Sequence, residues 1–130
     1  MNEANVIRLD HVAVYCEDFA AMKAFFAKYF HTVADEEHVS LRSGQTNCFL
    51  NFPDGRGRIE LMSYLGEPSE AHGRLSHLAL GVGSEEAVDR LTQMLKNDGY
   101  EVLSEPRHTG DGYYESSVKI PEGLHLEITV

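Results

Sequence analysis

Residues 8–14, Arg-Leu-Asp-His-Val-Ala-Val, are repeated half a chain later as Arg-Leu-Ser-His-Leu-Ala-Leu at residues 74–80. A second pair of phrases keeps nearly the same offset: Arg-Ile-Glu-Leu-Met at 58–62 and His-Leu-Glu-Ile-Thr at 125–129. The first pair places one histidine in each copy, and the second places one glutamate. This repetition predicts a duplicated structural unit that carries one histidine and one glutamate per copy.

The residues around these phrases predict the same order of elements in both halves: a strand, a helix and three further strands. In the first half, Glu17-Asp18 predicts the start of a helix that continues to residue 30. In the second half, Ser84 is a suitable N-cap, and Asp98-Gly99 supplies the stop, with glycine suited to a left-handed C-terminal cap. The predicted strands cover about residues 6–15, 38–42, 46–52, 58–64, 74–82, 100–105, 113–119 and 124–130, and the predicted apolar helix positions are Phe19, Met22, Phe25, Phe26, Tyr29, Val88, Leu91, Met94 and Leu95.

Two βαβββ modules in tandem place the chain in the α+β class. We expect one domain over residues 1–130, with module 1 at about 6–65, a polar linker at about 66–73 and module 2 at about 74–130. Each module has an open sheet face to bury and edge strands to cover, so a homodimer is expected.

The bulk composition excludes several classes of function. A net charge of −10 over 130 residues argues against nucleic acid and anionic membranes as partners, because both need a basic surface. No basic region precedes an apolar stretch at the N-terminus, and no apolar run approaches the roughly 18 residues of a membrane helix. Cys16 and Cys48 are isolated, which indicates reduced thiols. We therefore expect a cytoplasmic protein that acts on a small molecule.

The repeated histidines and glutamates are candidate ligands of one metal ion. Side chains alternate between the two faces of a strand, so residues of equal parity point together. If each histidine strand lies near the glutamate strand of its own module, His11, Glu60, His77 and Glu127 can converge. Burying carboxylates among Val, Ile and Leu is costly, and a shared cation would relieve that cost. The alternative is that each residue is an ordinary surface or hydrogen-bonded polar position.

The donor types indicate which ion such a site would hold. Two imidazoles and two carboxylates suit a borderline divalent ion, namely nickel, zinc, cobalt, manganese or iron(II). Four protein ligands on an octahedral ion would leave two positions for water or substrate oxygens, as Lewis-acid chemistry requires.

In its two βαβββ halves and its His–Glu–His–Glu order, the chain resembles the vicinal oxygen chelate superfamily. Within that superfamily it looks like glyoxalase I (lactoylglutathione lyase) and its small bacterial relatives. The resemblance spans residues 6–130 and implies a half-open, barrel-like mixed sheet around a metal cleft. It implies that the metal ligands are His11, Glu60, His77 and Glu127. The matching segments are 9–14, 59–61, 75–79, 126–128, and 111–115 followed by 121–123.

The resemblance also implies the chemistry of a lyase or isomerase. A hemithioacetal or other α-hydroxycarbonyl would bind the ion through its vicinal oxygens, and the ion would stabilise the enediolate. A glutamate would then move a proton between adjacent carbons. Glu127 is the first choice of base, with Glu60 as its counterpart on the other face of the substrate.

Two positions depart from the glyoxalase I pattern. In that enzyme an arginine four residues after the first ligand histidine, and an asparagine four residues after the first ligand glutamate, help to hold glutathione. Here these positions are Tyr15 and Tyr64, which argues against glutathione specificity. Arg58 and Arg107 are candidates to replace the lost charge. The candidate substrate residues are Tyr15, Tyr64, Arg58, Arg107 and Tyr114.

Two other functions stay open on the sequence. An extradiol-type dioxygenase would bind iron(II) through two histidines and one glutamate, but Glu60 would then fill a position that oxygen chemistry needs open. A bleomycin-resistance-like protein would bind a drug or other small molecule without a metal, and the four retained ligands argue against it.

Overall fold

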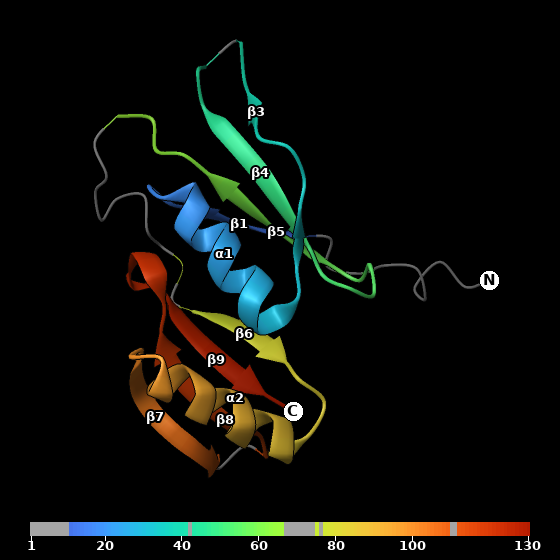
Figure 1. The fold of residues 1–130 in the computed structure, drawn as a ribbon, viewed down its shortest axis with the longest axis vertical. Coiled ribbons are helices and arrows are strands. Elements are labelled where there is room, and N and C mark those ends of the chain that lie inside the picture. The colour runs from blue at the N-terminus through green and yellow to red at the C-terminus, as the bar shows by residue number, and fades with distance from the viewer. Residues whose placement is uncertain (1–10, 42, 67–74, 76, 110–111) are drawn as a thin grey trace, which may run out of the picture. The chain divides into compact units, whose positions relative to one another are not determined.

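The computed structural model describes residues 11–41, 43–66, 75, 77–109 and 112–130. The chain divides into two compact units, residues 1–73 and 74–130 (Figure 1). Residues 6–10 of the first predicted strand and residues 67–73 of the predicted linker lie outside the described residues. Within the described part of the chain, no helix is long and apolar enough to cross a membrane.

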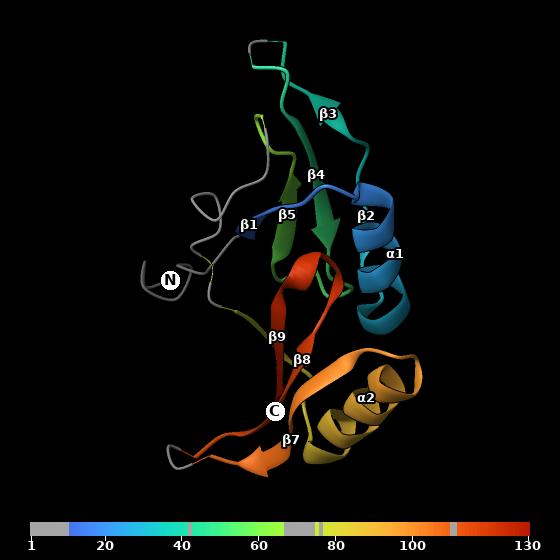
Figure 2. The same ribbon diagram turned by 90° about the vertical axis from the view of Figure 1, so that its left-hand side faces the viewer.

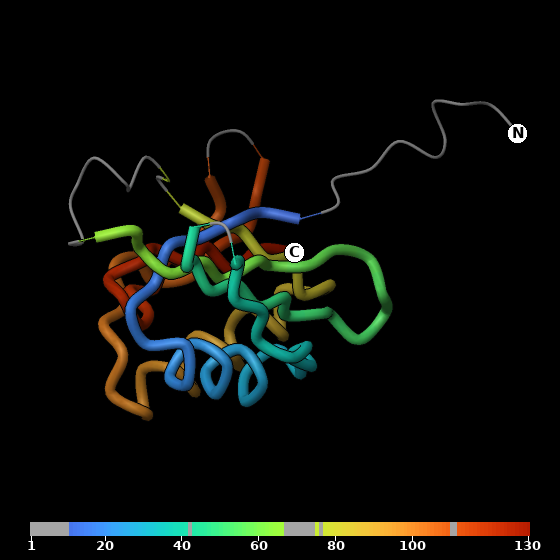
Figure 3. Tube along the Cα trace, turned by 90° about the horizontal axis from the view of Figure 1, so that it is seen from above, coloured from blue at the N-terminus to red at the C-terminus, as the bar shows by residue number. Residues whose placement is uncertain are grey.

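The first unit is a mixed sheet with one helix. Strand β1 pairs in parallel with β5, and the order across the sheet is β1-β5-β4-β2, with β3 also paired to β4. Helix α1 lies along one face of these strands, as Figures 1 and 3 show. The elements are β1 (His11–Tyr15), α1 (Phe19–Phe30), β2 (Val33–Ala34), β3 (His38–Val39), β4 (Thr46–Asn51) and β5 (Arg58–Met62).

The second unit repeats this arrangement. Strand β6 pairs in parallel with β9, the sheet order is β6-β9-β8-β7, and α2 packs on β7, β8 and β9 (Figure 2). The elements are β6 (Leu78–Gly81), α2 (Glu85–Asn97), β7 (Glu101–His108), β8 (Tyr114–Lys119), a 3₁₀ turn (Pro121–Gly123) and β9 (His125–Thr129). In the part of the chain that the structure describes, two helices and two mixed sheets, neither of them closed, confirm the predicted α+β class.

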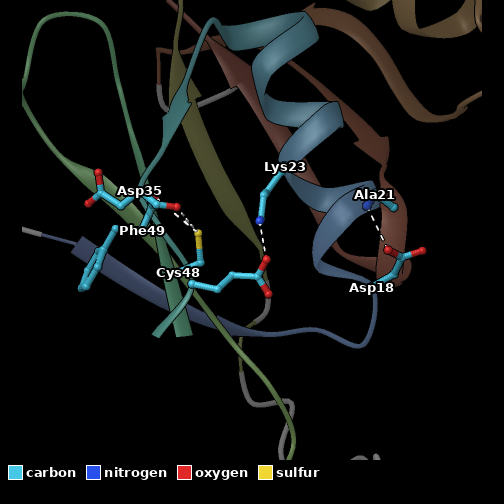
Figure 4. A network of polar contacts seen from close by, with 7 residues as sticks. Asp18, Ala21, Lys23, Asp35, Cys48 and Phe49 are labelled. Atoms are coloured by element: carbon cyan, nitrogen blue, oxygen red, sulfur yellow. Dashed lines mark hydrogen bonds and ion pairs between the residues drawn. The ribbon is translucent and has the colours of Figure 1, made fainter. Parts of the chain in front are cut away.

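The helix boundaries follow the predicted caps. The Asp18 carboxylate accepts a 3.0 Å hydrogen bond from the backbone N–H of Ala21, and Ser84 Oγ accepts one of 3.1 Å from that of Ala87. These bonds satisfy backbone donors that the first helical turn leaves without partners (Figure 4 shows the first). Beyond α2, Gly99 has a φ of 94°, the left-handed conformation that glycine adopts without strain.

The strand predicted at 38–42 is wrong in its extent. The structure has two short strands instead, β2 and β3, and the acidic residues between them make other contacts. Lys23 Nζ of α1 lies 2.6 Å from Glu37 Oε2, and Asp35 Oδ1 accepts a 3.0 Å hydrogen bond from Asn51 Nδ2. Figure 4 shows Lys23 reaching from the helix toward this segment, and the buried Cys48 thiol against the Asp35 carbonyl. In the second unit a single strand, β7, stands at the equivalent edge of the sheet, and its ladder with β8 contains two register shifts.

Each sheet buries the face that its helix covers. In α2 the predicted apolar stripe is wrong at one position, because Met94 is exposed and Thr92 is buried. The Thr92 hydroxyl donates a 2.7 Å hydrogen bond to the Val88 carbonyl and lies 2.6 Å from the hydroxyl of Ser116 on β8, so both buried hydroxyls have partners. The core residues include Val14, Cys16, Met22, Phe25, Phe26, Tyr29, Cys48, Leu50, Ile59 and Leu61 in the first unit, and Leu78, Val88, Leu91, Leu95, Val118, Leu126 and Ile128 in the second.

Candidate metal site

The first unit brings its histidine and glutamate together on the sheet face away from the helix. In the parallel β1–β5 pair, Ala13 lies opposite Glu60, so His11 is the diagonal neighbour of that glutamate. His11 Nε2 is 3.5 Å from Glu60 Oε1. The side chain of His11 is 37% exposed and that of Glu60 is 16% exposed, so both reach the surface of this open face.

The second unit builds the same pair by the same register. Ala79 lies opposite Glu127 in the parallel β6–β9 pair, and His77 directly precedes β6. His77 Nε2 is 3.4 Å from Glu127 Oε2. The parity argument is therefore confirmed inside each unit: each histidine shares a face with the glutamate of its own half.

The separation within each pair fits two ligands of one ion. Both distances exceed the 2.7–3.2 Å typical of an N–H···O hydrogen bond. Two ligands at about 2.1 Å from a tetrahedral ion lie about 3.4 Å apart, and cis ligands of an octahedral ion lie about 3.0 Å apart. The His11–Glu60 and His77–Glu127 separations of 3.5 and 3.4 Å lie within about 0.5 Å of both values. An imidazole nitrogen beside a carboxylate oxygen is also a donor set that divalent zinc or nickel accepts.

Each unit supplies two such candidate ligands. Within the described residues, no group of three or more histidine, cysteine, aspartate and glutamate side chains is assembled for a metal ion. A site with all four of His11, Glu60, His77 and Glu127 therefore stays a prediction.

Asn47 is a neighbour of the first candidate pair that the sequence interpretation missed. Its side-chain Nδ2 donates a 2.9 Å hydrogen bond to Glu60 Oε2, the oxygen that does not face His11. This contact fixes the rotamer of Glu60 and leaves Oε1 directed to the imidazole. Asn47 and Phe49 alternate on β4 with the buried Cys48 and Leu50. That alternation is the sequence signal that places Asn47 on the open face.

The ring of Phe49 packs against the first pair. Phe49 lies opposite Glu60 in the β4–β5 ladder, and its ring meets His11 edge-on with centroids 5.2 Å apart. The guanidinium carbon of Arg58 lies 4.0 Å from the centroid of the Phe49 ring, a cation–π contact. Arg58 is thus placed on the open face two residues from Glu60, as the strand parity predicts.

Tyr15 and Tyr64 also lie beside this pair. Their rings stack with centroids 5.3 Å apart and planes inclined by 18°. Tyr15 pairs with Met62, which is two residues from Glu60 and therefore shares its face.

The two remaining candidates lie elsewhere in the second unit. Arg107 lies on β7, two strands away from β9, and pairs with Glu115 of β8 after irregularities in the β7–β8 ladder. Its guanidinium donates a 2.7 Å hydrogen bond to Ser104 Oγ. Tyr114 alternates with the open-face residue Glu115 and bonds Asp89 of α2, so it lies on the helix side of its sheet. That hydrogen bond raises the pKa of Tyr114 to about 12. The structure does not bring Tyr114 to the face of Glu127.

A family model described as Glyoxalase/Bleomycin resistance protein/Dioxygenase superfamily matches residues 8–128. The chain belongs to this superfamily. A search of curated protein sequences found no match. The superfamily confirms the predicted resemblance, and its name spans lyase, binding and dioxygenase functions, so membership alone leaves the reaction open.

Solved structures share the superfamily fold. A possible glyoxalase from Bacillus cereus is 24% identical, with a TM-score of 0.71 over 96% of this chain and 100% of that chain. A glyoxylase/bleomycin resistance protein/dioxygenase domain from Frankia sp. EAN1pec is 16% identical, with a TM-score of 0.78 over 96% and 98%. The V278E glyoxalase I mutant from Zea mays is 18% identical, with a TM-score of 0.72 over 94% of this chain and 44% of that chain.

Proposed function

We propose that this protein is a glyoxalase-like, metal-dependent lyase or isomerase that acts on a small molecule with two vicinal oxygens. The observation that carries the proposal is the duplicated pair: His11–Glu60 and His77–Glu127 stand in equivalent registers at 3.5 and 3.4 Å. The four side chains would hold one divalent ion, and the ion would stabilise negative charge on the substrate oxygens. A thiol hemithioacetal is the first substrate class to test.

The two glutamates would have different roles. Glu60 is tethered through Oε2 by Asn47, which suits a carboxylate that stays in place. In the second unit, Ser117 lies opposite Glu127. The residue equivalent to Asn47 is Glu115, which lies opposite Thr129 just as Asn47 lies opposite Met62. No side-chain amide stands there to hold Glu127. This difference supports Glu127 as the base that takes a proton from one substrate carbon and returns it to the next.

Metal content and activity together test this proposal. Protein purified without added metal would be analysed for bound divalent ions, and His11→Ala and His77→Ala variants would be compared with a His31→Ala control outside both pairs. We expect each ligand variant to lower the metal-to-protein ratio and the control to keep it. Unchanged ratios in both ligand variants would refute the shared site.

An activity screen tests the reaction itself. The protein, reconstituted with nickel, zinc, cobalt, manganese or iron(II), would be assayed by absorbance against methylglyoxal mixed with glutathione, bacillithiol and other thiols. Isomerisation by any metal form supports the lyase or isomerase assignment. Metal binding without turnover, combined with uptake of oxygen in the iron(II) form, would favour a dioxygenase. Small-molecule binding without metal would favour a bleomycin-resistance-like role.

A further inference from the structure

The stacked tyrosines are an aromatic surface on the same sheet face as the metal-ligand pair of the first unit. Tyr15 is the last residue of β1, and Tyr64 is the second residue after the end of β5. Their rings are nearly parallel and both side chains are only half-buried. Because the two phenol rings stack on each other, a ligand ring would extend the stack by packing on an outer face of one of them.

The second unit has small residues at the positions equivalent to Tyr15 and Phe49. Tyr15 lies opposite Met62, whereas the equivalent pair in the second unit is Gly81 opposite Thr129. The ring of Phe49 opposite Glu60 is likewise replaced by Ser117 opposite Glu127. The same register and strand order are therefore built with small residues. The register therefore does not require aromatic rings at the positions of Tyr15 and Phe49.

The surface also lies at a useful distance from the reacting groups. Tyr15 is two strand residues, about 7 Å, past Ala13, which is the direct neighbour of Glu60 across the ladder. A group joined by one or two bonds to a carbon held near Glu60 would reach this ring. A methyl group would be too small to cover it.

We infer that the Tyr15–Tyr64 stack binds a flat aromatic ring of the substrate. The substrate class is then an aryl-substituted compound with vicinal oxygens, in preference to a small aliphatic one. This inference rests on the proposed function, because it assigns the ring to the same molecule whose oxygens bind beside Glu60.

A matched pair of chelating probes tests the inference. Benzohydroxamate and acetohydroxamate present the same two vicinal oxygens and differ only in a phenyl or a methyl group. Their dissociation constants would be measured by titration calorimetry on the full-length, zinc-loaded protein. We expect benzohydroxamate to bind about ten-fold more tightly, and the ring protons to shift upfield in NMR spectra because they lie over the tyrosine rings.

Variants separate ring binding from general affinity. The Tyr15→Leu/Tyr64→Leu protein is expected to lose most of the phenyl preference and the upfield shift. Tyr15→Phe and Tyr64→Phe should retain both, because they keep the rings. Tyr113→Leu, an exposed tyrosine of the second unit, is the control and should behave as the unaltered protein.

The outcomes distinguish this inference from the proposal beneath it. If neither hydroxamate binds the zinc-loaded protein, the vicinal-oxygen site fails, and the aromatic subsite fails with it. If both hydroxamates bind and the phenyl preference is the same in the Tyr15→Leu/Tyr64→Leu variant, ring binding by the Tyr15–Tyr64 stack is refuted while the proposed function stands. A leucine variant with a lower melting temperature and an unchanged preference would assign the stack a structural role and also refute the inference.

Discussion

The side-chain amide of Asn47 donates a 2.9 Å hydrogen bond to Oε2 of Glu60. His11 faces the other oxygen, Oε1, of the same carboxylate. One carboxylate oxygen therefore contacts Asn47, which positions it, and the other contacts the candidate ligand His11. Carboxylates that bind metals are commonly oriented by hydrogen bonds of this kind, and losing the partner weakens metal binding.

Replacing Asn47 should therefore weaken metal binding without unfolding the protein. We expect Asn47→Ala to lower zinc affinity about 10-fold, within the range found when partners of metal ligands are removed. The measurement is competition with a chromophoric chelator, accompanied by a thermal melt. Asn51→Ala is the matched control on the same strand, because Asn51 bonds Val33 and Asp35 instead of Glu60. Equal affinities in the two variants would remove Asn47 from the site.

The buried hydroxyl pair of the second unit gives a prediction about stability. Thr92→Val leaves Ser116 Oγ buried without this partner, and we expect the free energy of unfolding in urea to fall by about 1–3 kcal/mol. Adding Ser116→Ala removes the stranded hydroxyl as well. The double variant should then be less destabilised than the sum of the two single variants. Strict additivity would show that the two hydroxyls do not interact in solution.

Much of the architecture follows from local sequence signals. The repeated phrases predict two equivalent units, and the caps at Asp18 and Ser84 place both helix starts. Strand parity predicts the pairing of each histidine with the glutamate of its own unit. All of these depend on alternation, spacing or a single side chain, which a sequence displays directly.

The missed features depend on contacts between segments far apart in the chain. Two short strands, β2 and β3, replace the strand predicted at 38–42, and the acidic residues between them contact Lys23 of the helix and Asn51 of a later strand. Thr92 is buried because Ser116 of β8 meets it, which no helical periodicity reveals. The role of Asn47 likewise requires the β4–β5 register.

Tyr114 gives a prediction about pH. Its hydrogen bond to Asp89 raises the pKa of the phenol from 10.0 to about 12, so the folded state keeps the proton to higher pH than the unfolded chain. The stabilisation is complete below pH 10 and is lost as the pH rises through about 12. Asp89→Asn should return this phenol toward its ordinary pKa.

Two measurements check the Tyr114 prediction. Near-ultraviolet titration of tyrosinate should show one phenol of the unaltered protein that titrates later than in Asp89→Asn. The difference in unfolding free energy between the two proteins should be constant below pH 10 and shrink above it. A difference that grows with alkaline pH would contradict the assigned direction.

Glu127→Gln tests the base. The amide keeps the shape of the carboxylate and an oxygen that can face His77, but it cannot accept a proton from carbon at neutral pH. We therefore expect loss of isomerase activity by at least about 100-fold, the contribution typical of general base catalysis, with an unchanged circular dichroism spectrum.

Glu60→Gln is the matched comparison, because it alters the tethered carboxylate of the other pair. If Glu127 is the base, solvent deuterium exchange at the substrate carbon should persist in Glu60→Gln and vanish in Glu127→Gln, both assayed with bound metal. The opposite pattern would assign the proton transfer to Glu60, and full activity in Glu127→Gln would end the role proposed for its carboxylate.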